Sequence, residues 1–297
     1  MTNFQGEIAA LVAALLWAVA SVVYGRVGVY IPPLHLNLIK GIIAIVLLLV
    51  TIAFTGKLSF VIAPIPLYLL LLSGVIGIGL GDTAFLAGIN NLGARRLLLL
   101  ETLAPPMTAV LALIFLQERL NASAWCSILL TILGIAWVIS ERTEKEVSSK
   151  SSLRGIIFGL LAAVANAFGA VISRAALANT NINPLWAALL RLSAGVLFLL
   201  PLITLRREKL TSVPSPSKSW RIIGAICFAA FCGTYLGIWL QQTAIKLAPV
   251  GIASTLLQTS PIFALPLALG MGERISMRAT AGVLIAIAGI ALLFYLK

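Results

Sequence analysis

The two halves of this sequence repeat the same order of apolar segments and turn residues. The first half contains Pro106, Glu118-Arg119 and Gly134-Ile135-Ala136. The second half contains, 155 residues later in each case, Pro261, Glu273-Arg274 and Gly289-Ile290-Ala291. Earlier segments correspond as well, since Ala13-Ala14-Leu15 is matched by Ala162-Ala163-Val164 and Pro33-Leu34 by Pro184-Leu185. Such a chain is constrained to fold as two similar units, and membrane bundles with internal repeats commonly hold a functional site between them.

The composition indicates that the bilayer is the solvent of this chain. Of its 297 residues, 61% are hydrophobic and 10% are charged, whereas soluble domains carry about 25% charged residues. In a membrane the backbone polar groups must be satisfied within helices, and each span needs roughly 20 residues. We therefore expect ten transmembrane helices, over residues 8–26, 34–54, 66–90, 95–116, 122–140, 154–176, 184–205, 220–242, 248–270 and 278–296.

The repeat and the polar segment between its copies predict the domain organisation. Residues 6–140 form the first repeat, residues 141–153 a Ser/Glu/Lys-rich polar linker, and residues 154–297 the second repeat. Each repeat holds five helices, an odd number, so the two copies must have opposite orientations in the membrane. The expected fold class is an all-α integral membrane protein of ten transmembrane helices in two inverted five-helix repeats.

The net charge of +12 indicates membrane topology rather than nucleic-acid binding, because the basic residues are scattered over short loops. Fourteen of the 21 Lys and Arg residues follow odd-numbered helices, which by the positive-inside rule places those loops in the cytoplasm and both termini outside.

Four charged residues stand out inside the apolar spans: Lys40, Asp82, Glu101 and Arg191. Charges at this depth are costly and usually face a cavity or a partner. Lys40 and Arg191 occupy matching places in the two halves and can bind a carboxylate or phosphate, or can extend to the lipid headgroups. Asp82 lies beside a stripe of small residues, where it can line a cavity, make structural hydrogen bonds or end a helix.

Glu101 precedes Pro105 and Pro106, which predicts a broken helix. A proline leaves the carbonyl four residues earlier without its helical partner, so the carbonyls of Glu101 and Thr102 are freed, as is that of Leu257 before Pro261. A broken helix beside a carboxylate can form a polar site in a membrane. The alternative is a simple kink, with Glu101 paired to Arg95, Arg96 or Lys40.

Further polar and aromatic residues complete the candidate cavity. The predicted solute-binding residues are Trp17, Lys40, Asp82, Glu101, Asn166, Arg191, Tyr235, Trp239, Gln242 and Gln258, with Tyr24 and Gln241 as additional candidates. Trp and Tyr also occur in ordinary interfacial belts. With one histidine and three separated cysteines, we expect neither a metal site nor a cofactor. Motifs for nucleotide hydrolysis or covalent catalysis are not recognised in the sequence, so we expect a protein that is not an enzyme.

Several of these segments resemble the EamA-type members of the drug/metabolite transporter superfamily. The resemblance covers nearly all of residues 6–297 and is carried by Ala13-Ala14-Leu15-Leu16-Trp17, Gly79-Leu80-Gly81-Asp82-Thr83, Gly93-Ala94 followed by Pro105-Pro106, Gln117-Glu118-Arg119-Leu120, and Gly272-Glu273-Arg274-Ile275. It implies a multi-pass secondary transporter of the inner or plasma membrane, with a central cavity and an alternating-access cycle.

The resemblance also implies which classes of solute and which partners to expect. Family members often export amino acids or related metabolites, whereas others import, and the motifs do not identify the solute. We expect a monomer whose partners are a small solute and membrane lipid, with protons coupled through Asp82 or Glu101. A lipid-moving or channel-like protein, or an importer, is the alternative. The termini of family members are usually cytoplasmic, in conflict with the charge distribution, so the orientation stays open.

Overall fold

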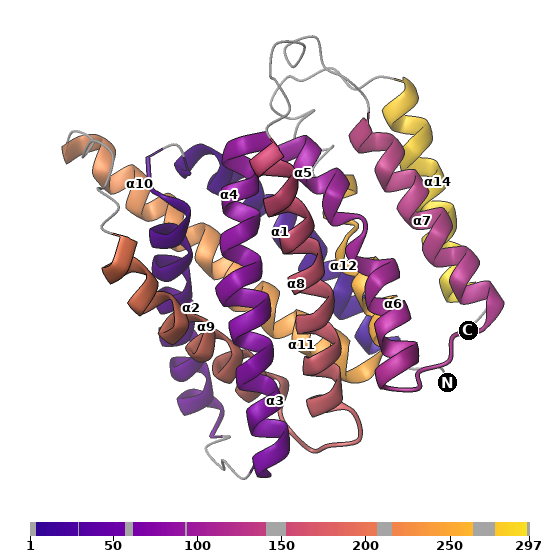
Figure 1. Ribbon diagram of the computed structural model, residues 1–297, viewed down its shortest axis with the longest axis horizontal. Helices are drawn as coiled ribbons and strands as arrows, with labels where there is room; N and C mark the ends of the chain where they lie inside the picture. The colour runs from indigo at the N-terminus through magenta and orange to yellow at the C-terminus, as the bar shows by residue number, and fades with distance from the viewer. Residues whose placement is uncertain are drawn as a thin grey trace.

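The computed structural model describes residues 4–28, 30–56, 62–92, 94–140, 153–206, 216–263 and 277–295, and over these residues it contains helices and no strand (Figure 1). The first half contains α1 (Gln5–Val27), α2 (Pro33–Thr55), α3 (Pro64–Gly74), η1 (Val75–Asp82), α4 (Thr83–Leu92), α5 (Ala94–Glu101), α6 (Ala104–Phe115) and α7 (Ala122–Ser140). The second half contains α8 (Leu153–Leu177), α9 (Pro184–Arg206), α10 (Pro216–Ala229), η3 (Ala230–Leu236), α11 (Gly237–Leu247), α12 (Val250–Leu257) and α14 (Met277–Tyr295).

The helix starts follow from local sequence. Pro33 and Pro64 occupy the first turn of α2 and α3, where the missing N–H costs nothing and the fixed φ angle favours a helix. Helix α2 ends at Gly56, whose φ of 64° is the left-handed conformation of a helix C-cap. The linker 141–152 and the motif Gly272–Ile275 lie outside the described residues, so the linker interpretation stays a prediction.

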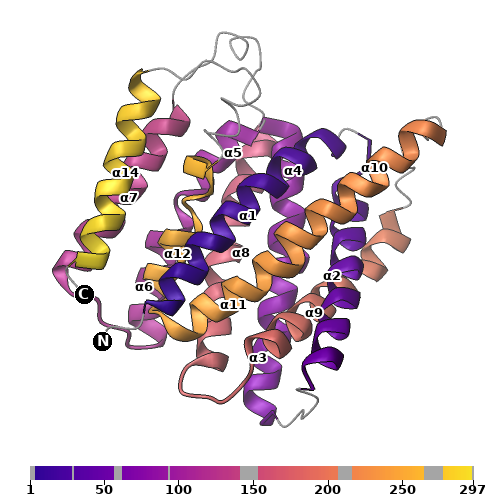
Figure 2. The same cartoon turned by 180° about the vertical axis from the view of Figure 1, so that it is seen from behind.

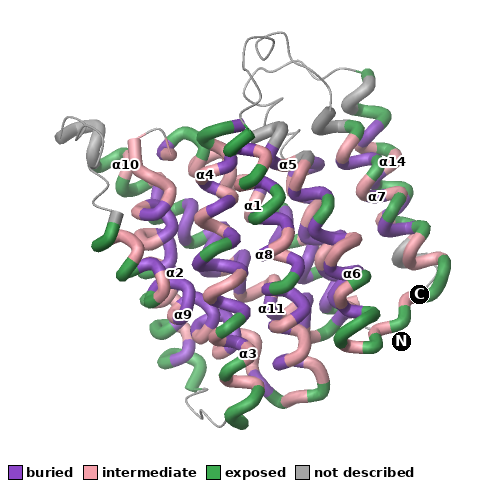
Figure 3. Tube along the Cα trace, in the orientation of Figure 1, coloured by how far each residue is buried: buried purple, intermediate pink, exposed green. Residues whose placement is uncertain are grey.

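By length and composition, six helices of the described part can cross a membrane: Gln5–Val27, Pro33–Thr55, Pro64–Leu92, Leu153–Leu177, Pro184–Leu205 and Trp220–Leu247. Four shorter helices are also apolar: Ala104–Phe115, Ala122–Trp137, Val250–Phe263 and Thr280–Leu292. Large apolar side chains such as Phe54, Leu133 and Leu197 are exposed. Exposed residues lie along the outer helices of the bundle (Figure 3). An apolar exterior around a buried interior is the arrangement that a multi-pass membrane protein requires.

The two halves contact each other in a reciprocal pattern. Helix α1 packs against α11, and its counterpart α8 packs against α3, while α2 packs against α9 and α6 against α12. Helix α1 begins at the end of the bundle where both chain termini lie, whereas α8 begins at the opposite end and runs back (Figure 1). This opposite direction of corresponding helices is what an inverted repeat requires.

Helices α7 and α14 close each half and lie side by side at one edge of the molecule (Figure 1 and Figure 2). A Cβ atom on Gly134 of α7 would lie 2.7 Å from the carbonyl oxygen of Gly282. A Cβ atom on Gly289 of α14 would lie 2.6 Å from the amide nitrogen of Thr131. The repeated Gly-Ile-Ala sequence thus permits a close backbone approach, as small residues do between membrane helices.

Two spans expected to be regular helices contain π-helical segments at equivalent places. Segment η1 (Val75–Asp82) interrupts the predicted span 66–90, and η3 (Ala230–Leu236), 155 residues after it, interrupts the span 220–242. Single π turns frequently occur at functional sites, because the extra residue changes the direction of side chains that follow. Both segments border the central cavity.

Candidate functional site

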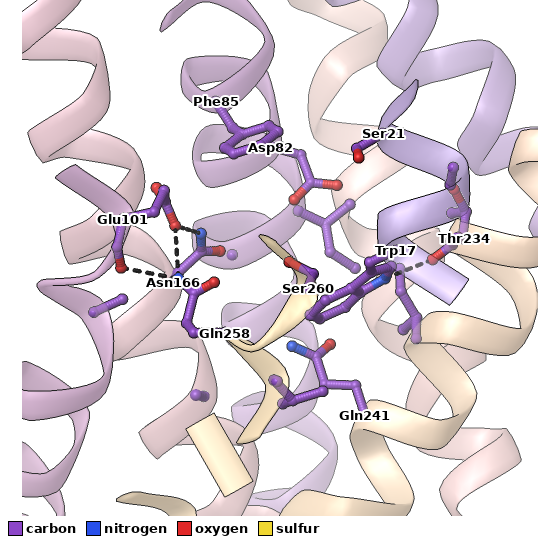
Figure 4. A pocket seen from close by; sticks show the side chains of 18 of the residues that line it. Trp17, Ser21, Asp82, Phe85, Glu101, Asn166, Thr234, Gln241, Gln258 and Ser260 are labelled. Carbon is purple, nitrogen blue, oxygen red and sulfur yellow. Dashed lines mark hydrogen bonds between the residues drawn. The ribbon is translucent and has the colours of Figure 1, made fainter. Parts of the chain in front are cut away.

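A central cavity of about 210 Å³ lies between the two halves (Figure 4). At about 30 Å³ for each water molecule in the liquid, it has room for on the order of seven water molecules. Residues of both halves line it, from α1, α2, η1, α4, α5 and α6 on one side of the sequence and from α8, α9, η3, α11 and α12 on the other. The cavity therefore lies at the repeat interface, where the internal duplication predicts a site.

Seven of the predicted solute-binding residues line this cavity: Trp17, Lys40, Asp82, Glu101, Asn166, Arg191 and Gln258. The additional candidates Tyr24 and Gln241 line it too. Their position in the cavity is observed, and their role in binding a solute stays a prediction.

Lys40 and Asp82 form an ion pair inside the cavity. The Lys40 Nζ atom of α2 lies 2.5 Å from Oδ2 of Asp82, the last residue of η1, and their side chains are 10% and 27% exposed. The Lys40 ammonium also lies 5.7 Å from the centroid of the Tyr24 ring, a favourable distance for a cation on an aromatic face. Lys40 therefore turns inward to a carboxylate instead of extending to the headgroups.

Glu101 is held by two amide side chains from the second half. The Asn166 Nδ2 atom donates to Glu101 Oε2 at 2.9 Å, and the Gln258 Nε2 atom lies 3.5 Å from the same oxygen. Glu101 is 3% exposed, and its other carboxyl oxygen, Oε1, is buried without a hydrogen-bond partner among the described residues. Lys40 pairs with Asp82 and not with Glu101, while the side chains of Arg95 and Arg96 lie outside the description.

The two helix breaks bring Glu101 and Gln258 together. The helical hydrogen bonding is interrupted at Thr102–Leu103 between α5 and α6, and at Gln258–Thr259 after α12. The Gln258 Nε2 atom donates to the backbone carbonyl of Glu101 at 2.8 Å. The carbonyl that Pro105 frees is thus satisfied by a side chain of the other broken helix, so the predicted break is present and joins the two halves.

Arg191 of α9 lines the cavity with a buried guanidinium group. The residue is 3% exposed, and Nε and Nη1 are buried without a hydrogen-bond partner among the described residues. Gly74 lies directly against the backbone of Arg191, and a Cβ atom on Gly77 would lie 3.0 Å from Arg191 Nη2. These two glycines give the backbone and the side chain of Arg191 their space, so Arg191 does not extend to the headgroups.

Trp17 lines the side of the cavity that lies opposite the Glu101 cluster (Figure 4). The Trp17 Nε1 atom donates to the carbonyl of Gly233 at 2.8 Å. Figure 4 shows Trp17 and Thr234 across the cavity from Glu101, Asn166 and Gln258, with Asp82 and Ser260 between them. Asn166 of α8 corresponds to Trp17 of α1, 149 residues earlier. The two halves therefore contribute different chemistry from equivalent positions.

Tyr235, Trp239 and Gln242 do not line the cavity, contrary to the sequence prediction. The Tyr235 hydroxyl lies 2.6 Å from Thr51 Oγ1, and its ring packs against Trp239 at 6.2 Å between centroids. Gln242 Oε1 accepts a hydrogen bond from Ser173 at 2.5 Å. These residues occupy the face of η3 and α11 that packs on α2, α8 and α9.

The neighbouring face of the same segment supplies cavity residues that the sequence did not predict. Thr234 and Ile238 line the cavity together with Gln241 and Ile245. Their spacing of three and four residues is the signal that assigns them to one helix face. The π-helical segment η3, which contains Thr234 and precedes the other three, changes which face this is. Ser21, Phe85 and Ser260 are further lining residues that were not predicted.

A second polar cluster joins the ends of four helices, and its charged side chains, Arg174 and Glu118, do not line the cavity. The Arg174 Nε atom lies 2.5 Å from Glu118 Oε1, and Arg174 Nη1 donates to the carbonyls of Ile245 at 2.8 Å and Lys246 at 2.7 Å. The Val250 amide donates to Glu118 Oε2 at 3.0 Å. The Gln117-Glu118-Arg119 motif therefore ties the end of α6 to α8, α11 and α12 at the end of the bundle where the termini lie.

Comparisons with known proteins match the whole length of the chain. The model of the EamA-like transporter family matches residues 4–140 and again residues 153–295. A solved structure described only as "Crystal structure of protein" has a TM-score of 0.80 at 16% sequence identity, with 99% of each chain covered. At this identity the likeness concerns the fold alone. No curated protein sequence matches the chain.

Proposed function

The chain belongs to the EamA-like transporter family and is a multi-pass membrane transporter of small solutes, and from this premise we propose that it is a secondary transporter that exports amino acids or related metabolites by alternating access. The observation that carries the proposal is the cavity between the two halves, which holds buried charged and amide side chains within an apolar bundle. Such a site at a repeat interface is where one half can move against the other around a bound solute.

The proposal includes ten membrane spans arranged as two inverted five-helix repeats in the inner or plasma membrane. Both halves of the cavity belong to one chain, so a monomer contains a complete transport site. The chain acts on its solute without changing it chemically, and is therefore a transporter and not an enzyme.

Protons are the proposed coupling ion, and Glu101 is the proposed proton carrier. Asp82 is already paired with Lys40, so protonation of Asp82 would leave a buried ammonium without its partner. Glu101 contacts neutral amides only, among the described side chains. Adding or removing a proton at Glu101 therefore breaks no ion pair, while it changes the charge of a carboxyl group that bridges both halves.

The test is solute export measured in proteoliposomes with and without a pH gradient. A thermal-shift screen of the purified protein against amino acids, nucleotides and sugar phosphates first supplies the solute, because a ligand that binds the folded state raises its stability. Wild-type protein is expected to move this solute faster when protons flow the opposite way. Glu101→Gln keeps the shape of the side chain and is expected to lose the acceleration while retaining solute exchange at equal pH.

Glu118→Gln is the matched control, since it makes the same change at a partly buried carboxylate that does not line the cavity. This variant is expected to keep its response to the pH gradient. If Glu101→Gln responds to the gradient as wild type does, Glu101 does not carry the proton. If wild-type protein moves no solute of the panel in either direction, the proposed transport function itself fails.

A further inference from the structure

We propose that Arg191 binds the carboxylate of the transported solute, and that this solute is a monocarboxylate with an apolar body. The inference rests on the proposed transport function and names the chemical class that the cavity accepts. It concerns Arg191, a charged side chain lining the described cavity whose Nε and Nη1 atoms have no hydrogen-bond partner among the described residues. The carboxylate of Asp82 attracts this guanidinium from a distance, without a salt bridge to it among the described residues.

The position of Arg191 is the first step. Its guanidinium lies in the middle of an apolar bundle, 3% exposed, with Nε and Nη1 buried and unpartnered among the described residues. Fully buried arginines are rare unless they are paired, because removing a charge from water costs several kcal/mol even after relaxation. An anion in the cavity would supply the missing acceptors.

Two glycines of the facing helix make room for Arg191, Gly74 for its backbone and Gly77 for its guanidinium. Any side chain at Gly74 would collide with the backbone of Arg191, and a methyl group at Gly77 would come within 3.0 Å of Nη2. Gly77 also lines the cavity beside Arg191. The guanidinium is therefore accommodated by its neighbours without being hydrogen-bonded by them.

The other ionisable groups of the cavity already have partners. Lys40 is neutralised by Asp82 at 2.5 Å, and Glu101 Oε2 accepts from Asn166 and lies near Gln258. When Glu101 is protonated, Arg191 is thus the cation of the described cavity lining whose charge no carboxylate in contact with it balances. One guanidinium matches the single charge of a carboxylate and its two oxygens, which the planar fork of arginine binds side by side. A phosphate ester would bring a second negative charge without a second cation.

The rest of the cavity determines the body of the ligand. Most of the lining surface is apolar, and its apolar residues include Ile78, Phe85, Leu86, Ile89, Ile238 and Leu257. An apolar group on the solute would displace water from these side chains, with a gain of about 25 cal/mol for each Å² buried. A solute with one carboxylate and an aliphatic or aromatic body therefore matches both regions.

Binding of matched acid and amide pairs to the full-length protein in nanodiscs tests the proposal. The probes are 4-methylpentanoate with 4-methylpentanamide, and 3-phenylpropanoate with 3-phenylpropanamide, so that each pair shares one apolar body and differs only in charge. Affinity is measured by calorimetry at constant pH. Each acid is expected to bind roughly 10- to 100-fold more tightly than its amide, the range of a charged hydrogen-bonded contact.

Arg191→Gln is expected to remove this preference, so that the acid and the amide bind equally. Arg191→Lys keeps the charge without the planar fork and is expected to retain part of the preference, which guards against loss of folding in the neutral variant. Arg154→Gln removes the same charge from an exposed position at the start of α8 and is expected to leave the preference unchanged.

Three results would overturn the inference. The first is equal binding of acids and amides by wild type, or no binding of either acid. The second is an acid preference that persists in folded Arg191→Gln. The third is tighter binding of 3-methylbutyl phosphate than of 4-methylpentanoate. Continued transport of another solute by Arg191→Gln would leave the proposed transport function standing while the carboxylate assignment fails.

Discussion

The ion pair between Lys40 and Asp82 predicts a specific non-additive pattern of stability. Breaking a buried pair by removing one charge costs about 3–5 kcal/mol, because the remaining charge stays buried. The Lys40 side chain is 10% exposed and that of Asp82 is 27% exposed, so water in the cavity screens part of this cost. We therefore expect the lower end, about 3 kcal/mol, for Lys40→Met and for Asp82→Asn.

The double variant Lys40→Met/Asp82→Asn removes both charges together. Replacing a buried pair by neutral residues of similar size is often close to neutral, so its loss of stability is expected to stay within about 1 kcal/mol. The double variant should then be about 2 kcal/mol more stable than either single variant, which departs from the additivity of independent sites.

The assay is equilibrium unfolding in mixed micelles with increasing SDS, followed by tryptophan fluorescence. Arg154→Gln is the control for loss of one positive charge at an exposed position and is expected to change stability by less than about 0.5 kcal/mol. Single variants that match wild type in stability would refute the reasoning, as would a double variant whose loss equals the sum of the single losses.

Two further predictions concern helix contacts of Gly134, Gly289 and Glu118, residues that do not line the cavity. Gly134→Ala and Gly289→Ala should each lower the free energy of unfolding by about 1–3 kcal/mol, since the new methyl group meets the backbone of the partner helix. Gly25→Ala is the control, because no atom lies within 4 Å of its new Cβ, and it should be neutral or stabilising. Equal unfolding midpoints for all three variants would contradict this prediction. Glu118→Gln should weaken the contacts of this side chain to Arg174 and to the Val250 amide. Hydrogen exchange measured by mass spectrometry should then become faster at the ends of α8 and α11 but not in α2. Unchanged exchange at these ends would show that the cluster does not stabilise them.

The sequence alone predicts the helical membrane fold because several of its features independently indicate the same fold. The apolar spans, the 155-residue offset and the opposite direction that an odd helix number imposes all lead to the same bundle. The polar residues that face the cavity also follow from one rule, since charges and amides inside a membrane turn away from lipid. Lys40, Asp82, Glu101 and Arg191 accordingly share one cavity.

The sequence does not predict which face of a helix turns inward when the helix is irregular. Tyr235, Trp239 and Gln242 lie on a segment where η3 changes the register of side chains, and all three turn away from the cavity. The partner of each charged residue is equally hard to read from the sequence, since three basic residues, Arg95, Arg96 and Lys40, could each have donated to Glu101. In the structure Lys40 pairs with Asp82, whereas Glu101 accepts hydrogen bonds from Asn166 and Gln258. These partners are set by distances between helices that are far apart in the chain.

The irregular segments of the two halves are equivalent, whereas the side chains they position are not. Both halves carry a π-helical segment beside the cavity and a broken helix across it. On this shared frame the first half places Trp17, Asp82 and Glu101, and the second half places Asn166, Arg191 and Gln258. In the proposed cycle a symmetric frame lets the halves exchange roles between two states of similar packing. The asymmetric side chains then allow a solute and a proton to favour one state over the other, because only a ligand that interacts differently with the two states can shift their balance.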